Sequence, residues 1–299
     1  MSFTRRIFRQ LRSKDMLNWM PDSWYLKLCY HFAVGKSLDL KNPKTFNEKL
    51  QWLKIHDRKD IYTTMVDKYE AKNYVAGLVG QEHVIPVLGV WESFKDINFD
   101  TLPEEFVLKC THDSGGLIIC KDKSKLDMEF LDKTFTKLLS TNYYYAHREW
   151  PYKNAKPRII AEKLMKDDAD TEGIGLMDHK FYCFNGEPKY LYISVGFSGS
   201  AFSDEGETRI SFLDMDWKPA PFGRSDYKEL DELPQKPSRF EDMVELARFF
   251  SKGTKFLRVD MYQINGEIYL SEFTFTPSAG YMPISPVEYE RILGDEITL

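Results

Sequence analysis

An apolar segment of the chain leads directly into a lysine and a pair of glycines. Residues 106–116 read FVLKCTHDSGG, which is typical of a buried strand followed by a loop of small residues. An ammonium group in a strand interior is costly to bury unless it has an anionic partner or reaches solvent. The segment therefore predicts an anion near Lys109. No GK[ST] sequence follows, so this anion is not held by a P-loop.

A second group of polar residues lies on a predicted β-hairpin. Residues 256–276 read FLRVDMYQINGEIYLSEFTFT, and the Asn-Gly pair at 265–266 predicts a tight turn between two alternating strands. Arg258 and Asp260 share one face, and counting outward from the turn brings Glu272 to about the level of Asp260. Facing carboxylates repel each other, and a bridging Mg²⁺ would reverse that cost. The alternative is that both carboxylates pair with Arg258 and a neighbouring lysine on a solvated face.

Four basic residues are placed along the chain so that they could converge on a polyphosphate. They are Lys68, Lys109, Lys180 and Arg258. Each one alone is more typical of a solvated helix or a strand edge. Together with the glycine pair, the carboxylate hairpin and Glu162 near the end of the predicted strand RIIAEKL, they predict an ATP site built without a P-loop.

The composition is typical of a globular chain with more than one packed unit. The 299 residues carry a net charge of −5 and are 42% hydrophobic, which favours two or three subdomains and gives no reason to expect nucleic acid as a partner. No apolar run is long enough for a membrane span, and the first residues lack the apolar region of a secretory signal, so we expect a cytoplasmic protein. The cysteines lack metal or redox spacing and are expected to be reduced and buried: Cys29, Cys110, Cys120 and Cys183.

The segment MSFTRRIFRQLRSK at residues 1–14 has a short basic amphipathic pattern. Its arginines and its lysine surround Phe3, Ile7, Phe8 and Leu11. One interpretation is a helix that contacts the anionic inner surface of the membrane peripherally. The other is the solvated face of an ordinary helix.

The order of predicted elements indicates an α+β fold. Helices are expected over 45–57, where Thr45 is the N-cap and Glu48 completes a capping box, and over 63–79. Strands at 83–88, 105–110 and 116–120 precede a helix at 127–144. From residue 158 the pattern changes to antiparallel strands, interrupted by one long helix at 239–253.

Six segments, taken in this order and spacing, resemble the ATP-grasp superfamily and within it the TupA-like branch, which is linked to teichuronopeptide and capsular polysaccharide biosynthesis. They are KTFNEKLQWLK, MVDKYEAKNYV, LPEEFVLKCTHDSGG, PRIIAEKL, DHKFYCFNGEPKY and LRVDMY…YLSEFTFTPSAG. The resemblance implies a helical region at 1–80, a lid subdomain with the glycine loop at 81–165, and a subdomain with the metal-binding hairpin at 166–299. The last two would clamp the nucleotide.

The resemblance also implies roles for individual residues. Phosphate oxygens would contact Lys68 and Lys109, under a lid formed by residues 111–116 that includes Ser114, Gly115 and Gly116, and Lys180 stays a candidate from its position on the predicted strand. Glu162 would take the adenine amino group, the backbone of Lys163 and Leu164 would form the hinge, and Asp178 would contact ribose or phosphate. Mg²⁺ would be held by Asp260, Glu272 and Thr274, and Arg258 would be the catalytic residue that stabilises an acyl phosphate.

Three positions depart from the family pattern, and one of them is Thr111, where that pattern favours asparagine. Thr274 stands where most ATP-grasp enzymes have a metal-binding asparagine, so its hydroxyl or a water would be the third ligand. Asp113 places a negative charge in the loop near the phosphates, where it would either point outward or contact the metal.

The activity implied by the resemblance is that of an ATP- and Mg²⁺-dependent ligase. Such an enzyme would join an amine or amino acid to a carboxylate, here that of a uronic-acid-type surface glycan or its precursor. A glycosyltransferase is the alternative, because Asp214 to Asp216 read D-x-D, a common metal motif of enzymes that use nucleotide-sugars. A non-catalytic glycan-binding or scaffold protein is the remaining class.

Overall fold

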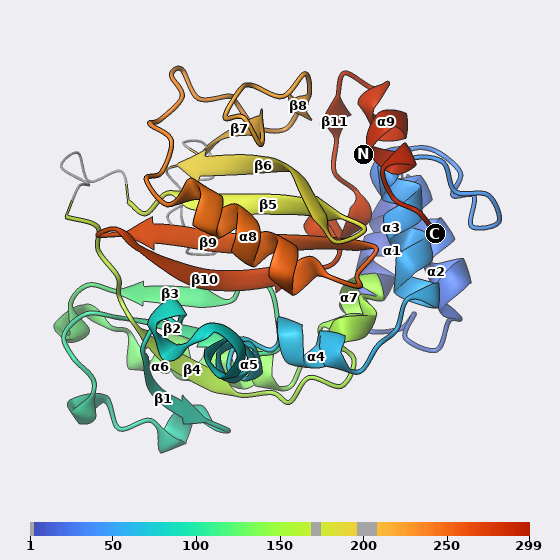
Figure 1. Ribbon diagram of the computed structural model, residues 1–299. Coiled ribbons are helices and arrows are strands. Elements are labelled where there is room, and N and C mark those ends of the chain that lie inside the picture. Colours follow the sequence, from blue (N-terminus) through green and yellow to red (C-terminus); the bar gives the residue numbers. More distant parts are fainter. Residues whose placement is uncertain (1–2, 169–174, 196–207) are drawn as a thin grey trace.

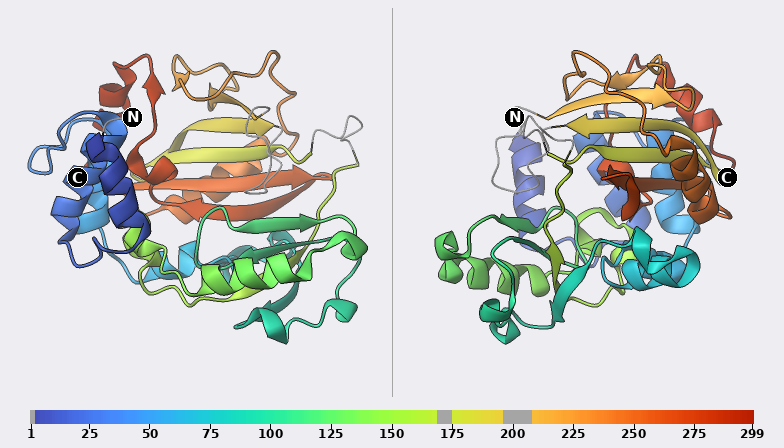
Figure 2. Two further views of the ribbon diagram at one scale, coloured as in Figure 1. Left: turned by 180° about the vertical axis from the view of Figure 1, so that it is seen from behind. Right: turned by 60° about the vertical axis from the view of Figure 1, so that its left-hand side comes forward.

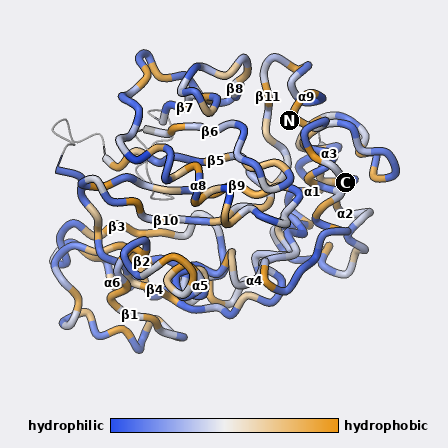
Figure 3. The backbone as a smooth tube through the Cα atoms, viewed as in Figure 1, coloured by the Kyte–Doolittle hydropathy of each residue, from blue (hydrophilic) through white to orange (hydrophobic). Residues whose placement is uncertain are grey.

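The computed structural model describes residues 3–168, 175–195 and 208–299. Its two main β-sheets are antiparallel and lie one beside the other, with a group of helices at one end (Figure 1). The expected α+β class is confirmed. Apolar residues are concentrated in the strands and helices, and many connecting loops are hydrophilic (Figure 3).

The smaller sheet has the strand order β1-β4-β2-β3. Its strands are β1 (Val87–Trp91), β2 (Phe106–Cys110), β3 (Leu117–Cys120) and β4 (Ile159–Lys163). Helix α6 (Met128–Leu139) buries Leu131 and Phe135 against one face of this sheet. Because side chains alternate across a strand, the opposite face carries Lys109 and Glu162.

The larger sheet has the order β10-β9-β5-β6-β7. Its strands are β5 (Asp178–Phe184), β6 (Glu187–Val195), β7 (Arg209–Asp214), β9 (Phe256–Ile264) and β10 (Glu267–Thr274). Helix α8 (Phe240–Ser251) covers one face, where Val259, Met261 and Phe273 form part of the largest buried core. Arg258 and Asp260 therefore point to the other face.

The remaining helices pack around the two sheets (Figures 1 and 2). They are α1 (Phe3–Ser13), α2 (Asp22–Val34), α3 (Phe46–His56), α4 (Ile61–Val66), α5 (Glu70–Val79), α7 (Tyr144–His147) and α9 (Tyr289–Asp295). Short 3-10 turns occupy Gln81–His83, Phe94–Asp96, Phe99–Thr101, Lys123–Lys125, Trp150–Tyr152 and Pro277–Gly280, and β8 (Gly223–Arg224) pairs with β11 (Ile284–Ser285).

The capping box of α3 is confirmed: the Thr45 hydroxyl accepts from the Glu48 amide, and the Glu48 carboxylate accepts from the Thr45 amide. The single helix expected over 63–79 is wrong. It divides into α4 and α5, because the Asp67 carboxylate accepts from the amides of Tyr69 and Glu70 and so starts a new helix.

Two further boundaries differ from expectation. The strand expected at 83–88 begins only at Val87, after a 3-10 turn, and the helix expected at 127–144 ends at Leu139. All four cysteines are buried and free. Within the described residues no helix has the length and apolar character needed to cross a membrane. The division at residues 80 and 165 stays a prediction.

Candidate active site

A buried carboxylate on the smaller sheet lies between two lysines. Glu162 on β4 is 2.8 Å from Lys109 Nζ on β2 and 3.1 Å from Lys72 Nζ on α5. Burial alone would raise the pKa of Glu162, but the two ammonium groups outweigh it and hold that pKa below its usual value. The anion that the strand predicted next to Lys109 is a carboxylate of the protein itself, that of Glu162.

Helix α5 is fixed to the strands by a second network. Asp67, just before α5, accepts hydrogen bonds from Arg158 at 3.1 Å and from the Thr111 hydroxyl at 3.2 Å. The Lys68 amide also donates to the Thr111 carbonyl. These contacts hold Lys68 and Lys72 at the end of β2, where the glycine loop begins.

The loop after β2 carries a lysine–aspartate pair. Lys68 Nζ donates to the Asp113 carbonyl and lies 3.6 Å from its carboxylate. Gly115 has a φ of 92°, which favours glycine, and a Cβ at Gly116 would lie 2.6 Å from the Asp113 carboxylate, so that side chain would have to shift. Asp113 points inward rather than outward: it is buried, and burial raises its pKa against the opposing effect of Lys68.

The face of the larger sheet away from α8 carries a row of paired charges. Asp260 is fully buried, and Arg258 donates to both of its oxygens at 2.7 and 2.6 Å. Lys180 donates to Asp260 at 2.8 Å and also to Asp178. Although burial opposes it, these two carboxylates raise the pKa of Lys180, so the lysine stays charged.

The expected meeting of Asp260 and Glu272 across the hairpin is found, and it depends on a β-bulge. The ladder pairs Leu270 with Met261 and then Glu272 with Asp260, so Ser271 is an extra residue. Without it, Ser271 would oppose Asp260 and Glu272 would point into the core beneath α8. Glu272 lies 3.7 Å from Arg258 and is more accessible than Asp260.

The alternative interpretation of the hairpin is correct about pairing and wrong about exposure. Asp260 does pair with Arg258 and a neighbouring lysine, Lys180, but it is buried rather than solvated, whereas Glu272 is partly exposed. Next to it, the Thr274 hydroxyl is buried without a hydrogen-bond partner. Within the described residues no three His, Cys, Asp or Glu side chains are arranged as a metal site.

A strained turn lies beyond β10. Ser278, Ala279 and Gly280 all have positive φ, between 51° and 71°, which is costly for the two residues that carry a Cβ. Lys54 and Gln51 on α3 donate to carbonyls of this turn. Burial lowers the pKa of Lys54 to about 8, against the opposing effect of Glu149.

This turn also contacts an arginine from β8. Arg224 donates to the Ser278 hydroxyl at 3.0 Å, pairs with Asp226 and lies 4.8 Å from the ring of Tyr227. It lines a pocket of about 470 Å³ together with Phe222 and Tyr227.

Three site residues were missed from the sequence: Lys72, Asp67 and Arg158. In the helix expected over 63–79, Lys72 follows Lys68 by four residues, and this helical spacing could have found it. Asp67 and Arg158 are distant in sequence, so only the fold shows that they meet.

The hinge and the D-x-D string have local structural roles. The Lys163 amide donates to the Pro86 carbonyl, so an adenine ring at this edge would use other backbone groups of Lys163 and Leu164. Asp214 accepts from the amides of Asp216 and Lys218 and so closes a turn after β7.

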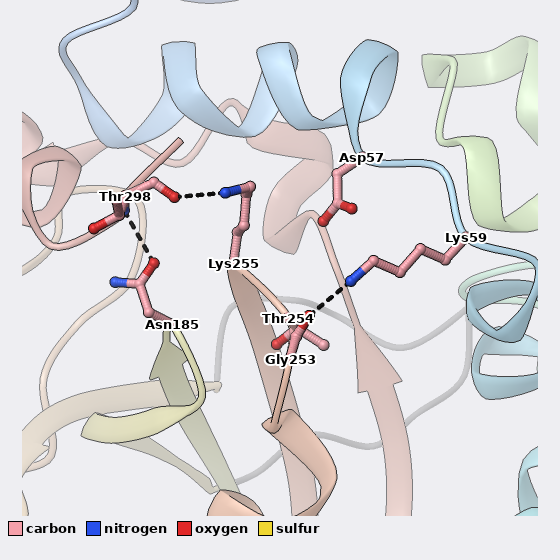
Figure 4. A pocket seen from close by; sticks show the side chains of 7 residues that line it. All are labelled: Asp57, Lys59, Asn185, Gly253, Thr254, Lys255 and Thr298. Carbon is pink, nitrogen blue, oxygen red and sulfur yellow. Dashed lines mark hydrogen bonds between the residues drawn. The ribbon is translucent and has the colours of Figure 1, made fainter.

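Another pocket, of about 430 Å³, is lined by none of the residues predicted for the ATP site (Figure 4). In it, Lys59 donates to the Gly253 carbonyl and Lys255 to the Thr298 carbonyl. Both ammonium groups already have backbone partners, so the pocket gives no separate indication of a ligand.

A family model described as TupA-like ATPgrasp matches residues 48–298. No curated protein matches the chain. Among solved structures, it is similar to a D-alanine–D-alanine ligase from Bacillus anthracis complexed with ATP, with 18% identity over 78% of this chain and 63% of that one and a TM-score of 0.42. A phosphoribosylamine–glycine ligase from Thermotoga maritima has 13% identity over 74% of this chain and 51% of that one, with a TM-score of 0.38. The chain thus spans about three fifths of the length of the D-alanine–D-alanine ligase structures.

Proposed function

We infer a function from one premise, that the chain belongs to the TupA-like ATP-grasp family. We propose that it is an ATP-dependent ligase that joins a carboxylate to an amine, with the carboxylate carried by a surface glycan or its precursor. The observation that carries the proposal is the charged row on the larger sheet, in which Arg258, Asp260 and Glu272 meet across a bulged hairpin.

The basic groups of the smaller sheet would bind the phosphates. Lys68 and Lys109 come from different elements and are held near each other by the Asp67 network, and Lys72 adds a third ammonium group. Each is paired with a carboxylate of the chain, so ATP would replace an existing anion rather than fill a bare cationic site. This exchange avoids an unpaired buried charge before ATP arrives.

The hairpin residues fit a magnesium ion. Asp260 and Glu272 supply the hard oxygen ligands that Mg²⁺ prefers, and the unpartnered buried hydroxyl of Thr274 stands where the third ligand was expected. These three residues would hold the ion. When bound it would neutralise charge on the phosphate oxygens.

Arg258 would stabilise the acyl group during the reaction. A carboxylate oxygen of the substrate attacks the γ-phosphorus of ATP, and ADP leaves. The neutral amine then attacks the acyl carbon, inorganic phosphate leaves, and the nitrogen releases one proton. Arg258 is fixed by two hydrogen bonds to Asp260, so its position is set before negative charge develops on the acyl oxygen.

The pocket around Arg224 supports a glycan as the carboxylate substrate. It combines a guanidinium group with aromatic side chains, a set suited to an anionic sugar. Arg224 lies near Tyr182, which is paired with Arg258 across β5 and β9. We therefore expect Arg224→Ala to raise KM for the carboxylate substrate about tenfold and leave ATP affinity unchanged, with Arg248→Ala, a half-buried arginine of α8 that lines neither site, as its control.

The test is binding followed by turnover. Calorimetry should show binding of ATP with Mg²⁺, and uronic acids supplied with amino acids should release ADP and give a product of summed substrate mass minus water. The proposed reaction consumes ATP, so we place it in the cytoplasm. Release of a nucleoside diphosphate from a nucleotide-sugar, with formation of a glycosidic bond, would instead identify a glycosyltransferase. Absence of any nucleotide binding would leave a non-catalytic glycan-binding protein.

A further inference from the structure

The first two helices and the loop between them expose several large apolar side chains. Trp19 is 77% exposed, Trp24 70%, Met16 55% and Ile7 40%. They occur within 18 consecutive residues, on the end of the molecule formed by α1 and α2 (Figures 1 and 2). Large tryptophan side chains are rarely left in water without a reason, so a partner for this surface is expected.

The same segment is strongly basic in an acidic chain. Residues 1–36 contain seven Lys and Arg against two Asp, a net charge of +5, whereas residues 37–299 contain 34 Lys and Arg against 44 Asp and Glu, a net charge of −10. Among the described residues, Arg5, Arg6 and Lys14 have no carboxylate partner within ion-pair distance. The charge of this surface is therefore available to an external anion.

The helix that carries these charges is fixed to the rest of the molecule. Phe8 is buried and stacks on Phe32 of α2, with ring centroids 4.7 Å apart. Arg12 lies 2.9 Å from His147 Nε2 of α7. With Phe8 and Arg12 facing inward, the 100° step between helical residues places Arg6 and Ser13 on the outward side.

We propose that this basic aromatic surface, formed by residues 5–24, docks on an anionic lipid bilayer. Arginine and lysine side chains would approach the phosphate headgroups, and the tryptophans would enter the interfacial layer, where their amphipathic rings are favoured. The positive charge selects an anionic partner and the exposed apolar groups select one with an apolar interior. A bilayer with acidic headgroups satisfies both requirements.

The experiment uses vesicles of phosphatidylcholine alone and of phosphatidylcholine with phosphatidylglycerol at about seven to three. We expect co-sedimentation with the anionic vesicles at low salt, a shift of tryptophan emission to shorter wavelength, and binding to neutral vesicles at least tenfold weaker. Raising the salt should weaken binding to the anionic vesicles.

Matched variants identify the surface. The triple variant Arg5→Gln, Arg6→Gln and Lys14→Gln should weaken vesicle binding at least tenfold. The control triple variant Lys121→Gln, Lys133→Gln and Lys137→Gln removes equal charge from an exposed surface on and near α6 and should bind as wild type. The double variant Trp19→Ala and Trp24→Ala should reduce affinity and abolish the emission shift. All substituted residues are exposed, so the variants should fold, which thermal melting checks.

Three outcomes would overturn the proposal. One is absence of binding to anionic vesicles at low salt. Another is an equal loss in the control triple variant, which would indicate non-specific attraction. The last is a stable dimer that the tryptophan substitutions dissociate, because a second copy would then cover this surface. None of these measurements depends on the proposed ligase activity.

Discussion

The two charged clusters of this molecule have opposite excess charge. The small-sheet cluster, Lys68, Lys72, Lys109, Asp113 and Glu162, has three cations and two carboxylates. The large-sheet cluster, Asp178, Lys180, Arg258, Asp260 and Glu272, has two cations and three carboxylates. The small-sheet cluster is therefore suited to phosphate and the large-sheet cluster to a metal ion. A nucleotide–magnesium complex has both kinds of charge and would satisfy both.

The clusters also differ in how they are held. The large-sheet cluster comes from β5, β9 and β10, three neighbouring strands of one sheet, so its geometry is set by the hydrogen-bond ladder. The small-sheet cluster combines two strands, the start of a helix and a glycine loop. We expect the first to be rigid and the second to adjust when its internal ion pairs are exchanged for those of a ligand.

The largest expected effect comes from the excess carboxylate of the large-sheet cluster. Glu272→Gln should reduce turnover about a thousandfold, or about 4 kcal/mol of transition-state stabilisation, because a metal ligand would be lost. Unfolding free energy should change little, since Glu272 is partly exposed and its nearest cation is 3.7 Å away. ADP release and denaturant unfolding measure the two.

Glu267→Gln is the matched control, because this glutamate starts the same strand on the exposed edge. Near-normal turnover in Glu272→Gln would mean that the hairpin is structural. Asp260→Asn is a poorer test. It would leave Arg258 and Lys180 buried beside too few carboxylates and should cost about 3–5 kcal/mol of stability.

How far the sequence could predict this arrangement is clear from the hairpin itself. The Asn-Gly turn and a count outward from it brought Asp260 and Glu272 to about the same level, although strict alternation from the turn would pair Asp260 with Ser271. They were not enough to reveal the bulge at Ser271, because a bulge is a property of two strands in register and leaves no local pattern. The count of six residues after the turn on one strand and five before it on the other already includes the extra residue of the bulge, but it does not explain why that residue is there.

The pairing of Glu162 shows why the contacts of the small-sheet cluster could not be predicted from the sequence. Its strand and its position were evident, and the resemblance suggested a contact with adenine. That the same carboxylate lies between Lys72 and Lys109 depends on how α5 packs against β2 and β4. Such tertiary pairing joins residues that are 90 and 53 positions apart in the sequence, and the adenine contact stays a prediction.

The second largest expected effect is on ATP affinity and comes from the small-sheet cluster. Lys109→Ala should weaken binding of ATP with Mg²⁺ ten- to a hundredfold, or about 1.5–3 kcal/mol, because one charge-assisted contact is lost. Calorimetry measures it. Lys163→Ala is the control, because its exposed side chain has no proposed role and only its backbone is expected to contact adenine. Equal affinities in Lys109→Ala and wild type would remove the small-sheet cluster from the nucleotide site.

A pH dependence should distinguish the two sheets. His179 lies on β5 of the larger sheet, and burial lowers its pKa to about 4, whereas strands β1–β4 contain no histidine. A group whose folded pKa is depressed contributes stability above its unfolded pKa, about 6.5, and that stability is lost as the pH falls toward 4. Lowering the pH from 7.5 to 5.5 should therefore cost about 1 kcal/mol of stability through this residue.

Denaturant unfolding of His179→Phe at both pH values tests this, because the variant should lack the part of the stability decrease that comes from His179. The exposed His56→Phe is the control and should retain the wild-type decrease. An identical decrease in His179→Phe and wild type would show that acid acts elsewhere in the molecule.

The smallest expected effect concerns Asp113, the carboxylate of the small-sheet cluster that lies in the glycine loop. The Asp113 carbonyl accepts a hydrogen bond from Lys68, and the buried Asp113 carboxylate lies near the Lys68 ammonium group. The negative charge of Glu272 adds to burial in raising the pKa of Asp113. Replacing it by asparagine keeps the shape and the carbonyl contact but removes a negative charge from beside the expected phosphates. Asp113→Asn should therefore tighten ATP binding about three- to fivefold, by up to about 1 kcal/mol. The control is Asp96→Asn, which changes an exposed aspartate after the same sheet's first strand and should leave ATP affinity unchanged.

Weaker ATP binding in Asp113→Asn would contradict this prediction. Asp113 would then be a ligand of the metal ion, and the loop, not only the larger sheet, would supply the carboxylates that the nucleotide–magnesium complex requires.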